Sequence, residues 1–493
     1  MTTTLHPSLF QANTRVWLTS LATKLGRPAT LDDIPDAELD RLAKTGFDWV
    51  WFLSVWKTGP AGQRVSRAND EWRREFQETL PDLREADIAG SGFAITGYAV
   101  PAGLGGNEAL ARLRQRLAER GLKLMLDFVP NHMALDHPWV ESHPDYFVAG
   151  TDVDLSREPQ NYVRVARKKG NTILAYGRDP YFSGWPDTLQ LDYSNPATQE
   201  AMTRELLKVA GRCDGVRCDM AMLALPEVFE RTWGRKSQPF WLQATGRVRE
   251  KFPDFRFMAE VYWDLEWTLQ QQGFDYTYDK RLYDRLREGH ARPVREHLHA
   301  APDYQIKLAR FLENHDEPRA AAAFEPPVHR AAAVITFTVP GLRFFHQGQL
   351  EGRLKRISPH LVRAPKEAPD KEIKAFYGQL LAVLRKPVMK AGAWQSLDPR
   401  PAWDGNGTWD SFVAHSWQGA GGERMLVAVN YSPLPSQCYL SLPFPEIEGR
   451  PVRLQDLLGP ACYDRDGHEL AGPGLYLDMP PWSYHAFSLE VTS

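Results

Sequence analysis

Residues 107–132 read NEALARLRQRLAERGLKLMLDFVPNH, and this stretch leads from a predicted helix into a predicted strand. Leucines recur at helical spacing in its first half, and Gly121 is a suitable helix stop. The apolar run 123–132 follows at once and ends in polar residues, as is typical of a buried strand that leads to a functional site. A helix that leads directly into such a strand favours a parallel sheet covered by helices.

The same alternation continues through the first 390 residues. A helix over 35–46 and a strand over 47–56 form a second clear unit. The predicted strands cover 14–21, 47–56, 123–132, 214–221, 255–263, 274–279, 307–316 and 342–349. Such a series favours a (β/α)8 barrel, in which the active site lies at the C-terminal ends of the strands. The alternative is a doubly wound open sheet, which usually carries a Gly-rich phosphate turn, and the sequence has none.

Two segments depart from this rhythm. The interval between the third and fourth predicted strands is far longer than one helix requires, and it is rich in Pro, Gly, His and Asp. Beyond residue 389, helical periodicity gives way to short predicted strands over 424–432, 437–444 and 474–479. We therefore predict a catalytic barrel of residues 1–132 and 187–389, an inserted subdomain of residues 133–186, and an antiparallel β-sandwich of residues 390–493.

The composition is that of a globular protein, with 43% hydrophobic and 25% charged residues. A formal net charge of −3 gives no indication of nucleic acid or of an anionic membrane as a partner. The N-terminal MTTTLHPSLF lacks the features of a signal peptide, and no apolar stretch is long enough to span a membrane. Because Cys213, Cys218, Cys438 and Cys462 form no CxxC pair, we expect reduced thiols in a cytoplasmic enzyme.

Charged and polar side chains interrupt the apolar strands near their C-terminal ends. The stretch DGVRCDMAM (214–222) carries Arg217 and Asp219, which are two residues apart and therefore face the same side of a strand. Other predicted strand ends carry Asp127 with His132, Glu260, and His315 with Asp316. A carboxylate in an apolar setting is costly unless it is paired, and one such intrusion is as often a structural ion pair as a functional group. Intrusions at several strand ends together indicate an active site.

Three carboxylates with an arginine and two histidines suggest cleavage of a glycosidic bond. That reaction needs one carboxylic acid to protonate the leaving oxygen and another carboxylate to attack or to direct water. Asp219 suits the anionic role because the neighbouring Arg217 favours its charged form. Glu260 suits the acid because apolar neighbours raise the pKa of a carboxyl. The alternative is a metal-dependent hydrolase that uses His132, His315 and Asp219, but the sequence lacks the close spacing typical of such sites.

Five motifs occur in the order known from one protein family. They are DFVPNH (127–132), PDTLQLDYSNP (186–196), GVRCD (215–219), AEVYW (259–263) and ENHDEPR (313–319). With these motifs the chain resembles, over essentially its whole length, the α-amylase superfamily of retaining α-glycosidases and transglycosidases. The resemblance implies a TIM barrel with a domain inserted after the third strand and a C-terminal sandwich.

The resemblance also implies a role for each matching residue. Asp219 matches the nucleophile that forms a covalent β-glycosyl-enzyme, Glu260 the acid/base, and Asp316 a third carboxylate that binds sugar hydroxyls. The implied substrate is an α-linked oligosaccharide or glucoside. The implied substrate-binding residues are the arginine that keeps the nucleophile ionised, two histidines that hydrogen-bond the sugar, an aromatic ring for stacking and a supporting carboxylate: Arg217, His132, His315, Phe93 and Asp127.

Departures from the family pattern limit what the resemblance implies. Asp219 is followed by MAML, where endo-acting amylases often carry a Lys-His pair that helps to bind glucan and calcium. Asn131 is the single residue that matches a calcium ligand, and the motif after Asp219 gives calcium no further support. We therefore predict no metal, and we also predict no organic cofactor. Gly90 and Ala323 stand where many exo-acting α-glucosidases carry an Asp and an Arg that hold the non-reducing end of the substrate.

The sequence thus predicts an enzyme that hydrolyses α-glucosidic bonds. The alternatives are a transglycosidase that transfers a glucosyl or maltosyl group to an acceptor, and a non-catalytic carbohydrate-binding relative, which usually loses carboxylates that this chain retains. The linkage and chain length, exo or endo action, hydrolysis as against transfer or phosphorolysis, bound calcium and the oligomeric state stay open.

Overall fold

The computed structural model describes residues 4–492 and contains a closed barrel of parallel strands in the order β1-β14-β13-β12-β11-β10-β5-β2. The strands are β1 (Ser8–Asn13), β2 (Trp49–Leu53), β5 (Lys123–Phe128), β10 (Gly215–Cys218), β11 (Arg256–Ala259), β12 (Tyr276–Tyr278), β13 (Leu308–Arg310) and β14 (Leu342–His346). The predicted barrel is confirmed, and the C-terminal ends of its strands meet at one mouth.

The first strand lies earlier than predicted. Residues 14–21, expected as a strand, belong instead to helix α1 (Thr14–Leu25), which follows directly after β1. The Asn13 side chain accepts a hydrogen bond from the Val16 N–H and so caps the helix, and Gly26 ends it in the left-handed conformation. The prediction was wrong because a short apolar stretch is compatible with both helical and strand periodicity. Here the N-cap at Asn13 favours the helix.

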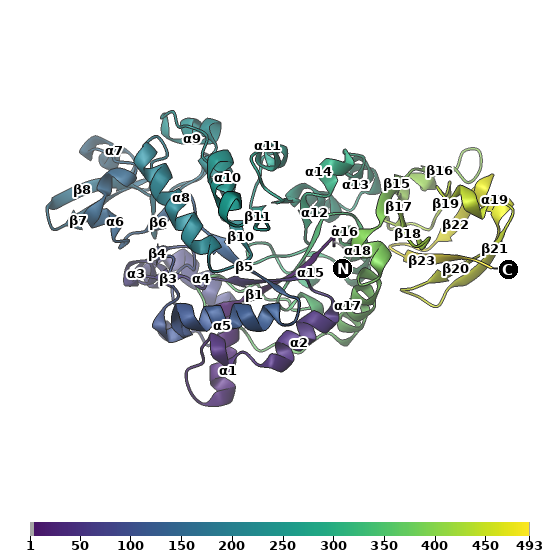
Figure 1. The fold of residues 1–493 in the computed structure, drawn as a ribbon, viewed down its shortest axis with the longest axis horizontal. Helices are drawn as coiled ribbons and strands as arrows, with labels where there is room; N and C mark the ends of the chain where they lie inside the picture. The colour runs from purple at the N-terminus through teal and green to yellow at the C-terminus, as the bar shows by residue number, and fades with distance from the viewer. Residues whose placement is uncertain (1–3, 493) are drawn as a thin grey trace.

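Helices cover the outside of the barrel (Figure 1). Besides α1 they include α2 (Asp36–Thr45), α5 (Gly106–Ala118), α8 (Pro196–Ala210), α10 (Trp241–Lys251), α11 (Glu266–Gln271), α12 (Lys280–Glu288), α13 (Ala291–Leu298), α16 (Pro326–Thr338) and α17 (Lys371–Leu384). The predicted helices over 35–46 and 107–121 correspond to α2 and α5. Because helices lie outside and side chains fill the inside, the strands are buried on both faces and read as continuous apolar runs. Within residues 4–492, no helix is long and apolar enough to cross a membrane.

Two long connections extend the mouth of the barrel. The connection after β5 carries β6 (His132–Ala134), α6 (Trp139–Ser142), α7 (Asp152–Arg157), β7 (Tyr162–Arg167), β8 (Gly170–Ala175) and β9 (Thr188–Gln190). Strands β6 and β9 pair with each other, so this ladder extends beyond both ends of the predicted segment 133–186. The connection after β2 carries β3 (Lys57–Thr58), α3 (Pro60–Ala68), α4 (Asp70–Thr79) and β4 (Ile95–Gly97), which the sequence analysis did not predict.

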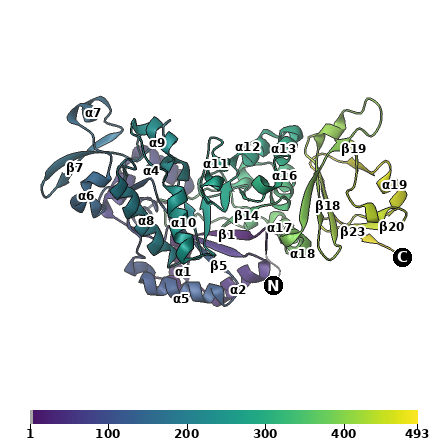
Figure 2. The same cartoon turned by 45° about the horizontal axis from the view of Figure 1, so that its top comes forward.

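The C-terminal part of the chain forms two antiparallel sheets, as predicted. One contains β15 (Ala393–Leu397), β17 (Phe412–Gln418), β18 (Arg424–Asn430), β23 (Tyr484–Val491), β20 (Pro451–Asp456) and β21 (Cys462–Asp466), and the other contains β16 (Pro399–Arg400), β19 (Ser436–Leu440) and β22 (Leu475–Met479). Side chains of β17 alternate, with Val413 and Trp417 packed in the main core and Phe412 and Ala414 packed between the two sheets. Figures 1 and 2 both show these sheets at the opposite end of the molecule from the β7–β8 hairpin.

Candidate active site

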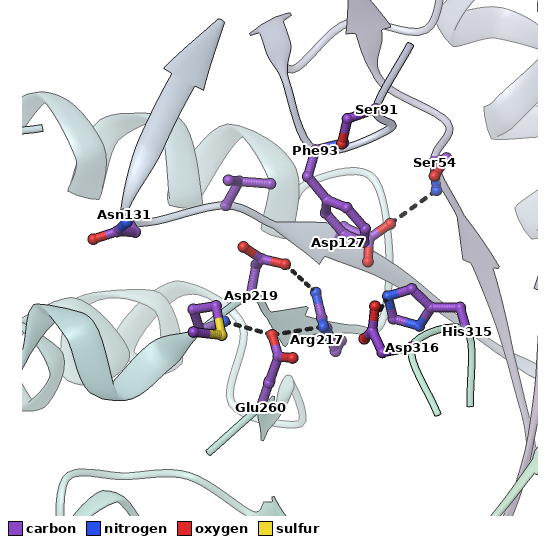
Figure 3. Close-up of polar contacts among 12 residues, drawn as sticks. Ser54, Ser91, Phe93, Asp127, Asn131, Arg217, Asp219, Glu260, His315 and Asp316 are labelled. Atoms are coloured by element: carbon purple, nitrogen blue, oxygen red, sulfur yellow. Dashed lines mark hydrogen bonds and ion pairs between the residues drawn. The ribbon is translucent and has the colours of Figure 1, made fainter. Parts of the chain in front are cut away.

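One arginine holds two carboxyl groups at the mouth of the barrel (Figure 3). Arg217 lies on β10 and is fully buried. Its Nη1 is 2.5 Å from Oδ1 of Asp219, just after β10, and its Nη2 is 2.7 Å from Oε2 of Glu260, just after β11. The phenol oxygen of Tyr278 accepts a further bond, of 3.3 Å, from Nε. The guanidinium therefore fixes both carboxyls side by side, and Arg217 and Asp219 share a face as the sequence predicted.

Glu260 is buried and bonded at both oxygens. Oε2 also accepts a 2.7 Å bond from the backbone N–H of Met220, and Oε1 accepts a 2.9 Å bond from the Tyr262 hydroxyl. These donors favour the charged form, but burial acts more strongly and raises the pKa of Glu260 to about 7. A carboxyl with that pKa holds its proton near neutral pH, as a general acid must.

The other two carboxyls differ in their exposure. Burial raises the pKa of Asp219, and the Arg217 guanidinium acts against that rise without cancelling it. Arg217 thus favours the charged form of Asp219, as expected, but the same guanidinium also pairs with Glu260. The side chain of Asp316 is 42% exposed, and its Oδ2 lies 3.1 Å from Nε2 of His315. Asp316 is thus the carboxyl of the cluster that is most open to a ligand.

His315 and Phe93 lie on the Asp316 side of Arg217 (Figure 3). The Gln11 amide, on β1, bonds Nδ1 of His315 at 3.0 Å, so the proton of the neutral ring is on Nε2, the nitrogen near Asp316. Burial lowers the pKa of His315 well below its ordinary value, so the ring is neutral. The ring of Phe93 lies 5.1 Å from the Arg217 guanidinium and 5.4 Å from the His315 ring. Its ring face covers the guanidinium, and the stacking on a sugar that the resemblance implies for Phe93 stays a prediction.

His132 comes from the other side of the mouth, at the start of β6. Its ring packs edge-on against Trp185, with 5.3 Å between ring centroids. Burial lowers the pKa of His132 to about 3, although Glu260 acts against that fall. His132 is therefore a neutral hydrogen-bonding group near neutral pH.

Asp127 lies on β5 and is 1% exposed, so it does not face the open cleft. Its carboxylate accepts bonds of 3.0 Å from the indole of Trp51 and from the backbone N–H of Ser54. Ser54 has φ 65°, a left-handed conformation that a non-glycine residue adopts only when its surroundings hold it. The contacts of Asp127 are those of a residue that supports the loop after β2.

Three residues that the sequence did not predict also bond to the site: Gln11, Tyr262 and Tyr278. Gln11 was missed because β1 was placed too late in the chain. Tyr262 lies two residues after Glu260 within the quoted AEVYW motif, and that spacing was the available signal. Tyr278 lies in an aromatic-rich strand, where no feature of the sequence distinguishes it from a packing residue.

The residues around Asn131 do not fit calcium. Nε2 of Gln190 donates to Oδ1 of Asn131 at 2.9 Å, and to the backbone oxygens of Asn131 and Leu191 at 3.1 Å each. The three oxygens that could bind a cation here instead accept hydrogen bonds from this uncharged amide nitrogen, which lies between them. Across the described part of the chain, no group of three or more His, Cys, Asp or Glu side chains is placed to hold a metal ion.

Gly90 and Ala323 carry no side chain that could reach a substrate. Gly90 has φ 86°, and a Cβ there would lie 2.9 Å from the backbone nitrogen of Gln63 in α3. Ala323 ends the short helix α15 (Ala320–Ala323). The close packing of α3 therefore requires glycine at residue 90, since any side chain would collide with that backbone.

Comparison with known families assigns the chain to a class. Residues 37–394 match the model of the alpha amylase catalytic domain, which is well over half of the chain. The protein belongs to the α-amylase family, in agreement with the resemblance of its motifs.

Individual relatives are distant. The chain is 24% identical over 311 residues to Alpha-amylase 3 of Dictyoglomus thermophilum, a match that covers 58% of each protein. It is 24% identical over 227 residues to an alpha-1,4-glucan:maltose-1-phosphate maltosyltransferase of Bifidobacterium longum, covering 46% of this chain and 25% of the relative. The chain thus matches less than two thirds of the length of these relatives. A solved structure of a noncanonic maltogenic alpha-amylase AmyB from Thermotoga neapolitana shares the fold, with TM-score 0.68 and 19% identity over 99% of both chains.

Proposed function

We propose that this protein is a retaining enzyme that cleaves α-glucosidic bonds of α-linked oligosaccharides. The observation that carries the proposal is the contact of one guanidinium with both Asp219 and Glu260. Holding two carboxyls side by side favours the separation of about 5 Å typical of retaining glycosidases over the longer separation of inverting ones. The membership of the α-amylase family supports the same substrate class.

The proposed reaction has two displacements. Asp219 attacks the anomeric carbon while the glycosidic C–O bond breaks, and Glu260 gives its proton to the leaving oxygen. Glu260 then takes a proton from water, the water oxygen attacks the anomeric carbon, and the bond to Asp219 breaks. Arg217 makes its shorter contact with Asp219, and the pKa of Glu260 is about 7, so we assign the negative charge to Asp219 and the proton to Glu260.

The test uses an aryl α-glucoside with a good leaving group and proton NMR of the products. Asp219→Asn should lower kcat by about 10⁴-fold, because the amide cannot attack. The wild-type enzyme should release the α-anomer first. Release of the β-anomer first, or near-normal turnover by Asp219→Asn, would refute the assignment.

Transfer to a sugar acceptor is a second candidate function, and an aromatic surface beyond Glu260 favours it. Tyr181 and Phe182 are 57% and 70% exposed, and the Tyr181 ring lies 5.0 Å from that of Trp263, three residues after Glu260. Exposed aromatic rings offer apolar faces on which a sugar stacks, with polar edges for its hydroxyls. The maltosyltransferase among the relatives agrees with this reading. Adding maltose to a reaction should divert product from free sugar to longer oligosaccharides if transfer competes with hydrolysis.

We further infer that the protein works in a reducing compartment such as the cytoplasm. All four cysteines are free, with Cys213, Cys218 and Cys438 buried and Cys462 exposed. An exposed free thiol suits a compartment that keeps thiols reduced. Labelling of the protein in intact and fractionated cells would test this location.

A further inference from the structure

Two loops that are far apart in the sequence meet beside Asp316. Helix α4, in the connection after β2, packs against the segment after β14 through a small separate core of Phe76, Leu80, Ile88 and Leu361. The two segments therefore form one continuous wall at this side of the mouth. We call it the loop wall, meaning residues 70–88, which begin with α4, together with residues 354–363.

Two arginines of the loop wall join its halves. Arg363 pairs with Asp82 at 3.1 Å and with Asp87 at 2.8 Å. Arg356 pairs with Glu75 of α4 at 2.5 Å. Both pairs connect the same two segments, so either could serve only to fasten them together.

Arg356 differs from Arg363 in what else it contacts. Its Nη1 lies 3.4 Å from the backbone oxygen of Asp316. The side chains of Arg356 and Glu75 are 35% and 39% exposed, so atoms of both remain open to a ligand. An arginine paired with a carboxylate offers donors and acceptors together, which is the combination that sugar hydroxyls need.

The orientation of a substrate follows from the proposed function, on which this inference rests. Glu260 gives its proton to the leaving oxygen, so the leaving part of the substrate lies on the Glu260 side. Asp316 and His315 lie on the other side of Arg217 in Figure 3. The sugar ring that is transferred to Asp219 therefore points toward Asp316 and, beyond it, toward the loop wall.

We propose that Arg356 and Glu75 bind the hydroxyls at the non-reducing end of the substrate, and that the loop wall closes the cleft there. The enzyme then acts on α-glucans from their non-reducing ends. Gly90 and Ala323 offer no polar side chain for this purpose, whereas Arg356 and Glu75 are both partly exposed and Arg356 contacts the backbone oxygen of Asp316.

The experiment compares Arg356→Met with Arg363→Met as a matched control. Arg356→Met removes one ion pair between the two segments and Arg363→Met removes two, but only Arg356 contacts Asp316. Arg356→Met should raise KM for maltotriose about tenfold with little change in kcat, since it removes hydrogen bonds to bound substrate. Arg363→Met should lower the melting temperature and leave KM unchanged, and Arg356→Lys should recover part of the lost affinity. If both Met variants change KM alike, or if Arg356→Met leaves KM unchanged, Arg356 does not bind substrate and only forms a structural ion pair between the two segments.

A second measurement tests the closed end of the cleft. Oligosaccharides labelled at the reducing end should give a first labelled product that is one residue shorter. A first product that is several residues shorter would show that the cleft continues past the loop wall.

Binding separates this inference from the proposed function. Calorimetry with maltose compares Asp219→Asn with the double variant Asp219→Asn, Arg356→Met, and needs no turnover. A tenfold weaker Kd in the double variant would support the subsite even if the wild-type enzyme cleaved none of the α-glucosides tested, which would refute only the proposed function. Equal Kd values would refute the subsite.

Discussion

Two fully buried arginines of the barrel, Arg217 on β10 and Arg310 on β13, pair with buried carboxyls whose pKa values are shifted in opposite directions. Arg310 bonds Asp279, and His297 bonds the same carboxylate at 3.0 Å. Burial raises the pKa of Asp279, but His297 and Arg310 together more than reverse this, and the pKa falls below its ordinary value. At Arg217 the pKa of Glu260 rises to about 7 instead.

The difference lies in the number of positive groups for each carboxyl. Asp279 has two positive or potentially positive partners, whereas Arg217 alone serves Asp219 and Glu260 and acts on the nearby Asp316. At these two sites the net pKa shift therefore follows the number of cations available to each buried carboxyl, and the carboxyl with fewer cations can hold a proton near neutral pH.

The largest effect should come from replacing each arginine by methionine. Arg217→Met should lower kcat/KM by about 10³-fold, because it removes the charge that positions and ionises Asp219. Arg310→Met should leave kcat/KM of the folded protein nearly unchanged, but should cost about 3–5 kcal/mol of stability because buried Asp279 loses its arginine partner and keeps only His297 as a side-chain partner. Urea unfolding and steady-state kinetics on both variants measure this. If folded Arg310→Met lost as much activity as Arg217→Met, the proposed difference in role between the two arginines would be refuted.

The next effect concerns the proton on Glu260. Glu260→Gln should slow substrates with poor leaving groups by about 10³-fold and spare aryl glucosides with good leaving groups, since only the former need an acid. Asp219→Asn, in contrast, should slow both kinds. Equal losses on both kinds of substrate with Glu260→Gln would assign the acid role elsewhere.

A smaller effect should appear in the dependence on pH, with opposite signs at the two sites. Because the raised pKa of Glu260 is about 7, the acid form is lost above that pH and kcat/KM should fall there. The pKa of Asp279 is lowered, so the stability it contributes is present above its ordinary value of 3.8 and is lost only as the pH falls below that value. Measurements of kcat/KM and of urea unfolding from pH 3 to pH 9 would show both the loss of activity at high pH and the loss of stability at low pH. A kcat/KM that stays constant up to pH 8 would contradict the assignment of Glu260 as an acid with a pKa of about 7.

The smallest effect concerns the Gln190 amide among three oxygens. Gln190→Asp replaces this donor with a carboxylate, so the variant should be less stable in EDTA and should recover in calcium. At calcium about 100 times Kd the recovery would be about 2.7 kcal/mol. Wild-type protein and Gln190→Asn are the controls, and neither should change its melting temperature with calcium. A wild-type melting temperature that rose with calcium would contradict the assignment of this place to the amide.

Much of the site was predictable because it sits at strand ends. Asp219 and Glu260 stand out as charges within apolar runs, and the order of motifs places them at one mouth. Helices α3 and α4 could not be predicted as part of the site, because their polar, surface-like sequence does not show that they pack against the segment after β14. Gln11 could not be predicted as a site residue because the first strand was placed at residues 14–21 and β1 lies before them.

The sequence by itself determined the barrel, the C-terminal antiparallel strands and the residue types of the site, because periodicity and polar intrusions are local properties. Only the tertiary structure decided how charge is shared. The contact of Arg217 with Glu260 as well as Asp219, the bond from Ser54 to Asp127 and the contact of Arg356 with Asp316 depend on distances between residues far apart in the chain, and electrostatic and hydrogen-bond energies depend on those distances. Spacing along the sequence does not contain them.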